Sequence, residues 1–244
     1  MNILSIGNSF SQDAQRYLHG VAKSAGVGIN CFNLYIGGCP LSRHYRNMLS
    51  EERAYTLEMN GISTGFSVSL KEALLNRDWD VITIQQASSK SVNYETYEPY
   101  IAALAAYVRE CAPKAKLVIH QTWGYEDGSY RLTEEMKYES FHGMFADIKS
   151  AYREAASSVK ADFIIPSGEV MAELIKSGIK VHRDSFHLSL GIGRYAAAIT
   201  WFKMLTGKDI SENAFSDFDV PVSSEEAAIA KCAADKICNK YLIK

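Results

Sequence analysis

The sequence is poor in cysteine and has no long apolar run. Its cysteines are odd in number, widely spaced and without a CxxC pair: Cys31, Cys39, Cys111, Cys232 and Cys238. This pattern argues against a disulfide framework or a zinc site and fits reduced thiols. No apolar stretch approaches the roughly 20 residues that span a bilayer, so the sequence predicts no membrane insertion.

Neither sign of charge is in marked excess, and phosphate-binding motifs are missing. The 26 basic and 28 acidic residues leave a formal net charge of −2, which gives no reason to expect a nucleic acid or an anionic membrane as partner. Neither Gly-x-Gly-x-x-Gly nor Gly-Lys-Ser/Thr follows the first apolar run, which counts against a nucleotide-binding domain. That run begins at Asn2 and leaves no room for a signal peptide. The chain as given is therefore expected in the cytoplasm, or in the periplasm or outside the cell if a signal was trimmed.

Short apolar runs alternate with longer helical patterns along all 244 residues. The sequence predicts strands at residues 3–6, 29–35, 81–84, 117–120 and 162–165. It predicts helices near residues 12–26, 66–77, 97–111, 134–158, 168–177, 189–206 and 223–241. This alternation is typical of an α/β fold, here a three-layer α/β/α sandwich around five parallel strands, and predicts one domain over residues 1–244.

Two segments interrupt the alternation. Residues 55–64 contain an Asn-Gly pair between alternating residues, which predicts a hairpin that either walls a cleft or decorates the surface. Residues 123–133 follow the fourth predicted strand and are rich in Gly, Tyr and acidic residues. Because binding residues concentrate on loops at this edge of an α/β sheet, residues 123–133 are the candidate substrate loop.

The first strand ends in a pattern that presents a hydroxyl group. The apolar run stops at Gly7, Ser9 follows two positions later, and a helical pattern begins soon after. Ser9 is the candidate nucleophile, provided that a base lies beside it. Ser11 is the alternative, but it is expected to be the N-cap of the next helix. Asp13, expected in the first helical turn, is attributed to the helix macrodipole and not to catalysis.

An acid and a base lie close together near the other end of the chain, in residues 184–187 (Asp-Ser-Phe-His). His187 is the candidate general base, and Asp184 would orient its imidazole and stabilise the positive charge formed on it. His182, two residues before Asp184, is the local alternative. No set of side chains has the spacing of metal ligands, so neither metal nor other cofactor is expected.

Four blocks of the sequence carry a resemblance to a known family. Residues 7–11 (Gly-Asn-Ser-Phe-Ser) resemble the first block of the SGNH (GDSL-like) hydrolase superfamily, with Asn8 where aspartate is commonest. Residues 37–39 (Gly-Gly-Cys) resemble the second block and residues 184–187 the last. The third block departs from the pattern. Residues 85–88 (Gln-Gln-Ala-Ser) replace Gly-x-Asn-Asp and resemble the glutamine-containing version found in carbohydrate O-acetylesterases.

The resemblance implies a flavodoxin-like strand order of 2-1-3-4-5 and a catalytic triad of Ser9, Asp184 and His187. It also implies an oxyanion hole. The expected donors are the backbone N–H groups of Ser9 and Gly38 and the side-chain amide of Gln85, which is preferred over that of Gln86. Amide groups and a flat ring suit a sugar, so the expected substrate-binding residues are Asn8, Gln86, Gln121 and Trp123.

The resulting prediction is a serine esterase that removes an acetyl or other short acyl group from a small-molecule ester, an acylated saccharide, through an acyl-serine intermediate. Two alternatives stay open. One is a catalytically silent carbohydrate-binding module on the same fold, which the unusual third block would favour. The other is a lipase or thioesterase that uses the same residues on longer acyl chains.

Overall fold

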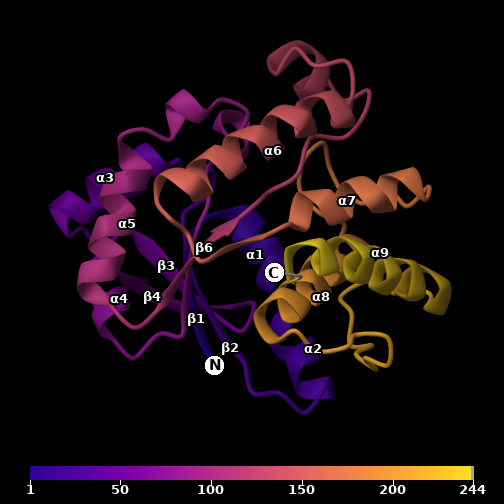
Figure 1. The fold of residues 1–244 in the computed structure, drawn as a ribbon, viewed down its shortest axis with the longest axis horizontal. Helices are drawn as coiled ribbons and strands as arrows, with labels where there is room; N and C mark the ends of the chain where they lie inside the picture. The colour runs from indigo at the N-terminus through magenta and orange to yellow at the C-terminus, as the bar shows by residue number, and fades with distance from the viewer. Residues whose placement is uncertain (243–244) are drawn as a thin grey trace.

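The computed structural model describes residues 1–242 and contains a seven-stranded mixed sheet in the order β4-β3-β2-β1-β5-β6-β7 (Figure 1). The strands are β1 (Asn2–Gly7), β2 (Asn30–Tyr35), β3 (Tyr55–Met59), β4 (Ile62–Val68), β5 (Val81–Ile84), β6 (Lys116–His120) and β7 (Phe163–Ile165). The five predicted strands pair in parallel and in the predicted order. The prediction of a sheet of five parallel strands is wrong, because β3 and β4 add two antiparallel strands.

The two additional strands form the hairpin that the Asn-Gly pair predicts. Asn60 and Gly61 have φ angles of 50° and 78°, the left-handed conformations that a two-residue hairpin turn requires. The hairpin is part of the sheet, and its residues do not line the cavity into which Ser9 faces. Its first strand pairs with β2, from Phe32 opposite Met59 to Tyr35 opposite Thr56, and extends the sheet. Helix formation near residues 66–77 is confined to α4 (Leu70–Leu75).

Helices cover both faces of the sheet and form the outer two layers (Figure 1). One layer contains α3 (Leu41–Ser50), α4, α5 (Tyr100–Cys111) and α6 (Phe141–Ser158). The other contains α1 (Ser9–Gln15), α2 (Leu18–Ser24), α7 (Ser167–Lys176), α8 (Ile192–Thr206) and α9 (Ser224–Leu242). Short turns of helix span Ser88–Lys90, Tyr94–Thr96 and Arg131–Glu135.

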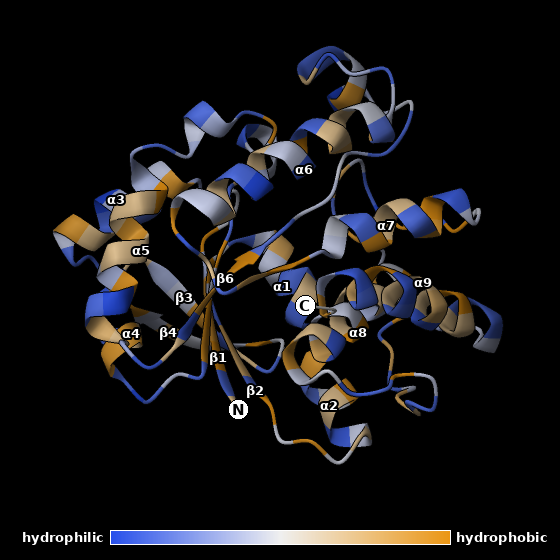
Figure 2. Cartoon of the chain, in the orientation of Figure 1, coloured by the Kyte–Doolittle hydropathy of each residue, from blue (hydrophilic) through white to orange (hydrophobic). Residues whose placement is uncertain are grey.

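The central strands are apolar because helices cover them on both sides. Ile3, Ile6, Ile82 and Ile84 are fully buried, and Figure 2 shows the hydrophobic colour gathered on the middle strands with hydrophilic residues on the outer helices. Among residues 1–242, no helix combines the length with the apolar character that a membrane crossing requires.

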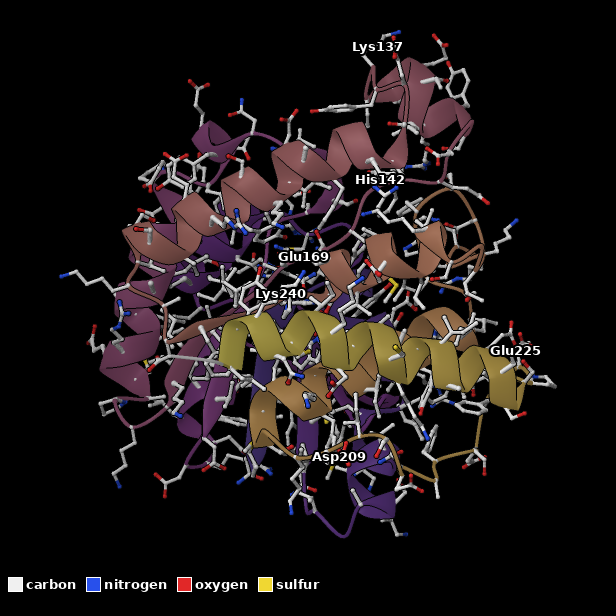
Figure 3. All side chains as sticks on the ribbon, turned by 45° about the vertical axis from the view of Figure 1, so that its right-hand side comes forward. Lys137, His142, Glu169, Asp209, Glu225 and Lys240 are labelled. Carbon is white, nitrogen blue, oxygen red and sulfur yellow. The ribbon has the colours of Figure 1, made fainter. Side chains whose placement is uncertain are left out.

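The C-terminal helix α9 closes the second layer by packing against α7 and α8. Figure 3 shows Glu169, at the start of α7, near the last turns of α9, where Lys240 lies. The Glu169 carboxylate accepts a hydrogen bond from the Tyr241 hydroxyl and pairs with Lys149 of α6 at 2.8 Å. These contacts fasten α6, α7 and α9 together beside the sheet edge where β1, β5 and β6 end.

Candidate active site

Ser9 is held at the carboxyl end of β1 by a tight strand-to-helix turn. A Cβ atom at Gly7 would lie 2.1 Å from Ser11 Oγ, so no larger residue fits where the strand ends. Asn8 is the N-cap of α1: its Oδ1 accepts a hydrogen bond from the Phe10 N–H at 3.0 Å. Ser9 is the first residue of the helix, and its side chain faces a cavity at the sheet edge.

The expectation that Ser11 is the N-cap residue is wrong, because the helix begins three residues earlier than the sequence pattern suggests. Ser11 is the third helical residue and is fully buried. Its hydroxyl accepts from the Asn8 N–H at 3.0 Å and lies 2.8 Å from Asn33 Oδ1. These bonds leave Ser11 with no access to a substrate.

The fold brings Ser9, His187 and Asp184 together from opposite ends of the chain. Ser9 Oγ lies 2.9 Å from His187 Nε2, and His187 Nδ1 lies 2.9 Å from Asp184 Oδ2. Because the carboxylate can only accept, the imidazole donates to it through Nδ1, and Nε2 is left to accept the Ser9 proton. This is the order of contacts that a nucleophile, its base and an orienting acid require.

Asp184 is fixed as a carboxylate by the backbone that follows it. Burial favours the neutral acid, but the N–H groups of His187 and Phe186 and the imidazole outweigh it and lower the pKa of Asp184 to about 2. The two N–H groups reach Asp184 Oδ1 at 2.8 and 3.0 Å. The acid is therefore charged throughout the neutral range and preset to hold the imidazole.

His182, the local alternative base, is turned away from this chain of contacts. It is 4% exposed, and its Nε2 lies 3.0 Å from the Gly124 carbonyl oxygen, to which it donates. Burial lowers the pKa of His182 despite the opposing effect of nearby acids. Its position supports the loop that follows β6, whereas His187 alone of the two contacts Ser9.

Asp13 fastens the acid–base segment (residues 184–187) to helix α1, which carries Ser9. The expectation that Asp13 lies in the first helical turn is wrong: it lies one turn further on and is fully buried. It pairs with Arg183 at 2.9 Å and with Arg194 at 2.8 Å, and it accepts from the Leu188 N–H at 3.0 Å. Because Arg183 and Leu188 lie on either side of the acid and base, the carboxylate sets the position of that segment.

Trp123 supports the acid–base segment from beneath and does not line the cavity. It is fully buried and stacks on Phe10 with 4.4 Å between the ring centroids. Its indole N–H donates to the Phe186 carbonyl oxygen at 2.8 Å. A ring so enclosed offers no face to a sugar. The structure therefore gives no support to the prediction that Trp123 stacks on a substrate sugar.

A cavity of about 270 Å³ opens beside Ser9. It is lined by residues of all four sequence blocks and of the candidate substrate loop, and by Tyr35 and Ser89 in addition. The block and loop residues are Asn8, Ser9, Phe10, Gly37, Gly38, Ala87, Ser88, Tyr125, Arg131, Phe186 and His187. Sequence reasoning did not anticipate Tyr35, Ser88 and Arg131 as individual site residues. Arg131 and Tyr125 lie within the predicted substrate loop. The position of this loop directly after β6 was therefore the one sequence signal that pointed to them.

The two residues expected to donate backbone N–H groups to an oxyanion, Ser9 and Gly38, both line the cavity. The N–H of Ser9 is the first of α1 and so has no acceptor within the helix. Gly38 lies on the cavity wall with a φ of 60°, a conformation that strains other residues. The glycine therefore allows the loop after β2 to turn its backbone toward the cavity.

Gln85 lies behind Asn8 and not on the cavity wall. Its Nε2 donates to Asn8 Oδ1 at 2.8 Å, and its Oε1 lies 2.6 Å from Nδ1 of His120. The other ring nitrogen of His120 lies 3.1 Å from the Ser167 hydroxyl. The buried chain from Ser167 to Asn8 leads to the helix cap, so the amide of Gln85 supports Asn8 and, through it, the turn that presents Ser9.

Two of the expected substrate-binding amides are buried as well. Gln86 accepts from the Leu41 and Ala87 N–H groups at 3.0 and 2.9 Å and donates to the Thr96 carbonyl oxygen at 2.9 Å. Gln121 is fully buried and accepts from the Glu169 N–H at 3.3 Å. Of the four residues expected to bind substrate, Asn8 alone lines the cavity; the other three hold the surrounding loops in place.

A larger cavity, of about 630 Å³, lies between α9 and residues 209–211. It is lined by Asp209, Lys231, Cys232 and neighbouring residues, and Figure 3 shows Asp209 on the loop below α9. No serine lies beside a histidine among its lining residues, so the candidate catalytic residues are those at the smaller cavity. Within residues 1–242, no three His, Cys, Asp or Glu side chains form a group able to hold a metal ion.

Comparisons with known proteins agree with this fold. A family model described as a domain of unknown function, DUF4886, matches residues 2–237. A crystal structure of a DUF4886 family protein from Bacteroides uniformis is 34% identical, with a TM-score of 0.92 over 100% of this chain and 96% of that one. No curated protein matches the sequence.

More distant structures with the same fold are described as candidate hydrolases. A candidate SGNH hydrolase from Slackia heliotrinireducens is 21% identical, with a TM-score of 0.58 over 83% of this chain and 97% of that one. A candidate GDSL-like lipase from Parabacteroides merdae is 17% identical, with a TM-score of 0.54 over 84% and 95%. The fold is thus that of SGNH and GDSL-like hydrolases. The narrower likeness to glutamine-containing O-acetylesterases stays a prediction.

Proposed function

The chain belongs to the DUF4886 family, and from that premise we propose that it is a serine hydrolase of carboxylic esters. One observation carries the proposal: two contacts of 2.9 Å join Ser9 Oγ to His187 Nε2 and His187 Nδ1 to Asp184. A serine hydroxyl is a weak nucleophile near neutral pH, and an adjacent imidazole held in the correct tautomer is what activates it. These contacts favour an enzyme over a silent binding module.

In the proposed reaction Ser9 Oγ attacks the ester carbonyl carbon while its proton passes to His187 Nε2. The carbonyl oxygen becomes an oxyanion, and the backbone N–H groups of Ser9 and Gly38 donate to it. The imidazolium then gives its proton to the leaving alcohol and the acyl-serine forms. A water molecule that His187 deprotonates attacks the acyl carbon, and the acid is released as Ser9 recovers its proton.

Gln85 acts in this proposal as a positioning residue. The predicted direct donation to the oxyanion competes with the 2.8 Å bond that its amide makes to Asn8. Asn8 caps helix α1, and the first backbone N–H of that helix belongs to Ser9. Without the Gln85 amide, this N–H donor would therefore be held less firmly in place but would not be removed. The oxyanion would thus rest on backbone groups, with Gln85 acting through Asn8.

A short acyl group suits the site better than a long chain. The cavity of about 270 Å³ lies below the range of roughly 300–1,000 Å³ typical of sites for drug-sized ligands. Tyr35 and Ser88 add hydroxyl groups to its wall, the second of them 2.9 Å from the hydroxyl of the buried Tyr125, and such groups suit the hydroxyl groups of a saccharide. We therefore keep an acylated saccharide as the proposed substrate, ahead of the long-chain esters of a lipase or thioesterase.

We also propose that residues 1–244 form one domain. One sheet runs through the described residues, and one family model spans residues 2–237.

Labelling with a fluorophosphonate tests the nucleophile directly, because the reagent reacts with an activated serine. Wild type should be labelled and Ser9→Ala should not, while the matched variant Ser89→Ala, which removes another cavity-wall hydroxyl, should keep the label. p-Nitrophenyl esters of rising chain length should lose kcat/KM beyond the shortest acyl groups, and acetylated sugars should be deacetylated. Persistent labelling and turnover in Ser9→Ala would reject Ser9 as the nucleophile.

A further inference from the structure

A fixed positive charge lies on the wall of the proposed active site. Arg131 lies in the candidate substrate loop, at the start of the short helical turn Arg131–Glu135, and lines the same cavity as Ser9. Its guanidinium carbon lies 4.4 Å from the centroid of the Phe186 ring, and the Phe186 and His187 rings lie 3.9 Å apart. Phe186 therefore contacts both the guanidinium group of Arg131 and the imidazole of the proposed base.

This charge is only weakly balanced by the protein. Glu135 Oε2 lies 3.9 Å from Arg131 Nη1, too far for a hydrogen bond, and both side chains are about half exposed. An ion pair with such geometry stabilises little. Arg131 is the only permanently charged side chain among the described residues that line the cavity, and no carboxylate lines it.

The contacts of Phe186 indicate which portion of an ester substrate, alcohol or acyl, Arg131 would meet. In ester cleavage, His187 Nε2 must reach the oxygen of the leaving alcohol, so the alcohol portion lies beside the imidazole. Phe186 contacts that imidazole and Arg131 contacts Phe186. A guanidinium presents several N–H donors in a plane that matches the oxygens of a carboxylate, phosphate or sulfate.

We propose that Arg131 recognises an anionic group on the alcohol portion of the substrate, so that this site prefers negatively charged esters. The inference rests on the proposed esterase function and narrows it. Among acylated saccharides, it selects those whose sugar carries a carboxylate, phosphate or sulfate group. Arg131 thus acts in specificity, while Ser9, His187 and Asp184 carry out the chemistry.

The test compares two acetyl esters that differ in one charge, 4-acetoxybenzoate and its methyl ester. The ratio of their kcat/KM values is measured at low ionic strength for wild type, Arg131→Gln and Arg131→Lys. Because Arg131 is half exposed, the ratio should fall only about three- to tenfold in Arg131→Gln, and Arg131→Lys should keep part of the preference. Comparing this ratio between wild type and the variants cancels the intrinsic difference in leaving-group reactivity.

Arg77→Gln is the matched control. Its guanidinium also lies on an aromatic ring, 4.1 Å from the centroid of Phe32, but Arg77 precedes β5 at the opposite edge of the sheet. The ratio should not change in this variant. Raising the salt concentration from about 0.1 M to 1 M, where the screening length falls from about 10 Å to 3 Å, should erase the wild-type preference.

A second pair of esters checks the assigned side. 4-Nitrophenyl hydrogen succinate and its methyl ester place the charge on the acyl portion, and their ratio should be the same in wild type and Arg131→Gln. An unchanged ratio for the acetoxybenzoate pair, or a change confined to the succinate pair, would overturn the inference while leaving the esterase intact. Failure of wild type to cleave any of the four esters would overturn the proposed function and the inference with it.

Discussion

Asp13 provides a test of how the acid–base segment is held, and Asp13→Asn is the smallest change that disturbs it. The amide keeps the shape of the carboxylate but loses its charge and one acceptor oxygen. The fully buried carboxylate contacts Arg183, Arg194 and the Leu188 N–H at 2.8–3.1 Å. In the variant, an NH₂ group would face an N–H donor at one of these contacts.

The expected loss of stability follows from what the two arginines retain. Removing one partner of a buried ion pair costs about 3–5 kcal/mol. Here Arg194 keeps Asp219 at 3.1 Å, and Arg183 keeps the Leu188 carbonyl oxygen at 2.6 Å. The free energy of unfolding should therefore fall by less, about 2–3 kcal/mol. Because Leu188 follows the base, a shift of about 1 Å in this segment should lower kcat about 100-fold.

Urea unfolding and steady-state hydrolysis of 4-nitrophenyl acetate measure the two effects separately, with kcat taken where both proteins are folded. Asp219→Asn is the control, since Asp219 belongs to the same ion-pair network through Arg16 and Arg194 but makes no bond to the acid–base segment. It should cost some stability and leave kcat within a few-fold. If Asp13→Asn unfolds more easily yet retains wild-type kcat, Asp13 has no role in positioning the base.

Four further outcomes are expected. His187→Ala should lower kcat by several orders of magnitude and His182→Ala far less, because His187 alone contacts the nucleophile; the reverse order would move the base. Gln85→Ala should lower the free energy of unfolding by about 1–3 kcal/mol by leaving buried groups of Asn8 and His120 unpaired, with a smaller effect on kcat. A 100-fold loss of kcat at unchanged stability would instead make Gln85 a direct oxyanion donor. Burial lowers the pKa of His120 to about 3, so the unfolded chain takes up this proton first as the pH falls below about 6.5. The free energy of unfolding should then fall with pH by about 1.4 kcal/mol per unit from this group, and His120→Gln should flatten the slope in urea titrations between pH 7 and 5. Chelation should leave activity unchanged, and a loss that zinc restores would contradict the serine mechanism.

The sequence predicts those parts of the fold that depend on local patterns. The buried parallel strands are continuous apolar runs bounded by turn residues, and the five predicted strands lie within a residue or so of β1, β2, β5, β6 and β7. Asp184 and His187 contact each other across three positions of chain, so their spacing alone suggests a pair. That Ser9 meets them follows from the resemblance and from the shared edge at which such strands end.

Other parts depend on contacts that leave no local signal. The Asp13 pair with Arg183 joins residues 170 positions apart, so neither residue looks different from a surface charge. Strand β4 is largely exposed and lacks the apolar alternation that marks a half-buried strand. Trp123 and Gln86 have the chemistry of ligand-binding residues, but burial, which a single sequence does not reveal, commits them to the protein backbone.

Hydrogen-bond direction explains how a glutamine can stand in the third block without touching an oxyanion. Asn8 Oδ1 accepts from a backbone N–H, so the Gln85 group that meets it at 2.8 Å must be the amide nitrogen. The Gln85 oxygen then faces His120, whose lowered pKa leaves it neutral with one N–H to donate at 2.6 Å. Each bond fixes the next, and the chain ends at the residue that caps α1. In the proposed mechanism, rigidity at the helix start would take the place of a donor from the third block, because the first N–H of that helix belongs to Ser9.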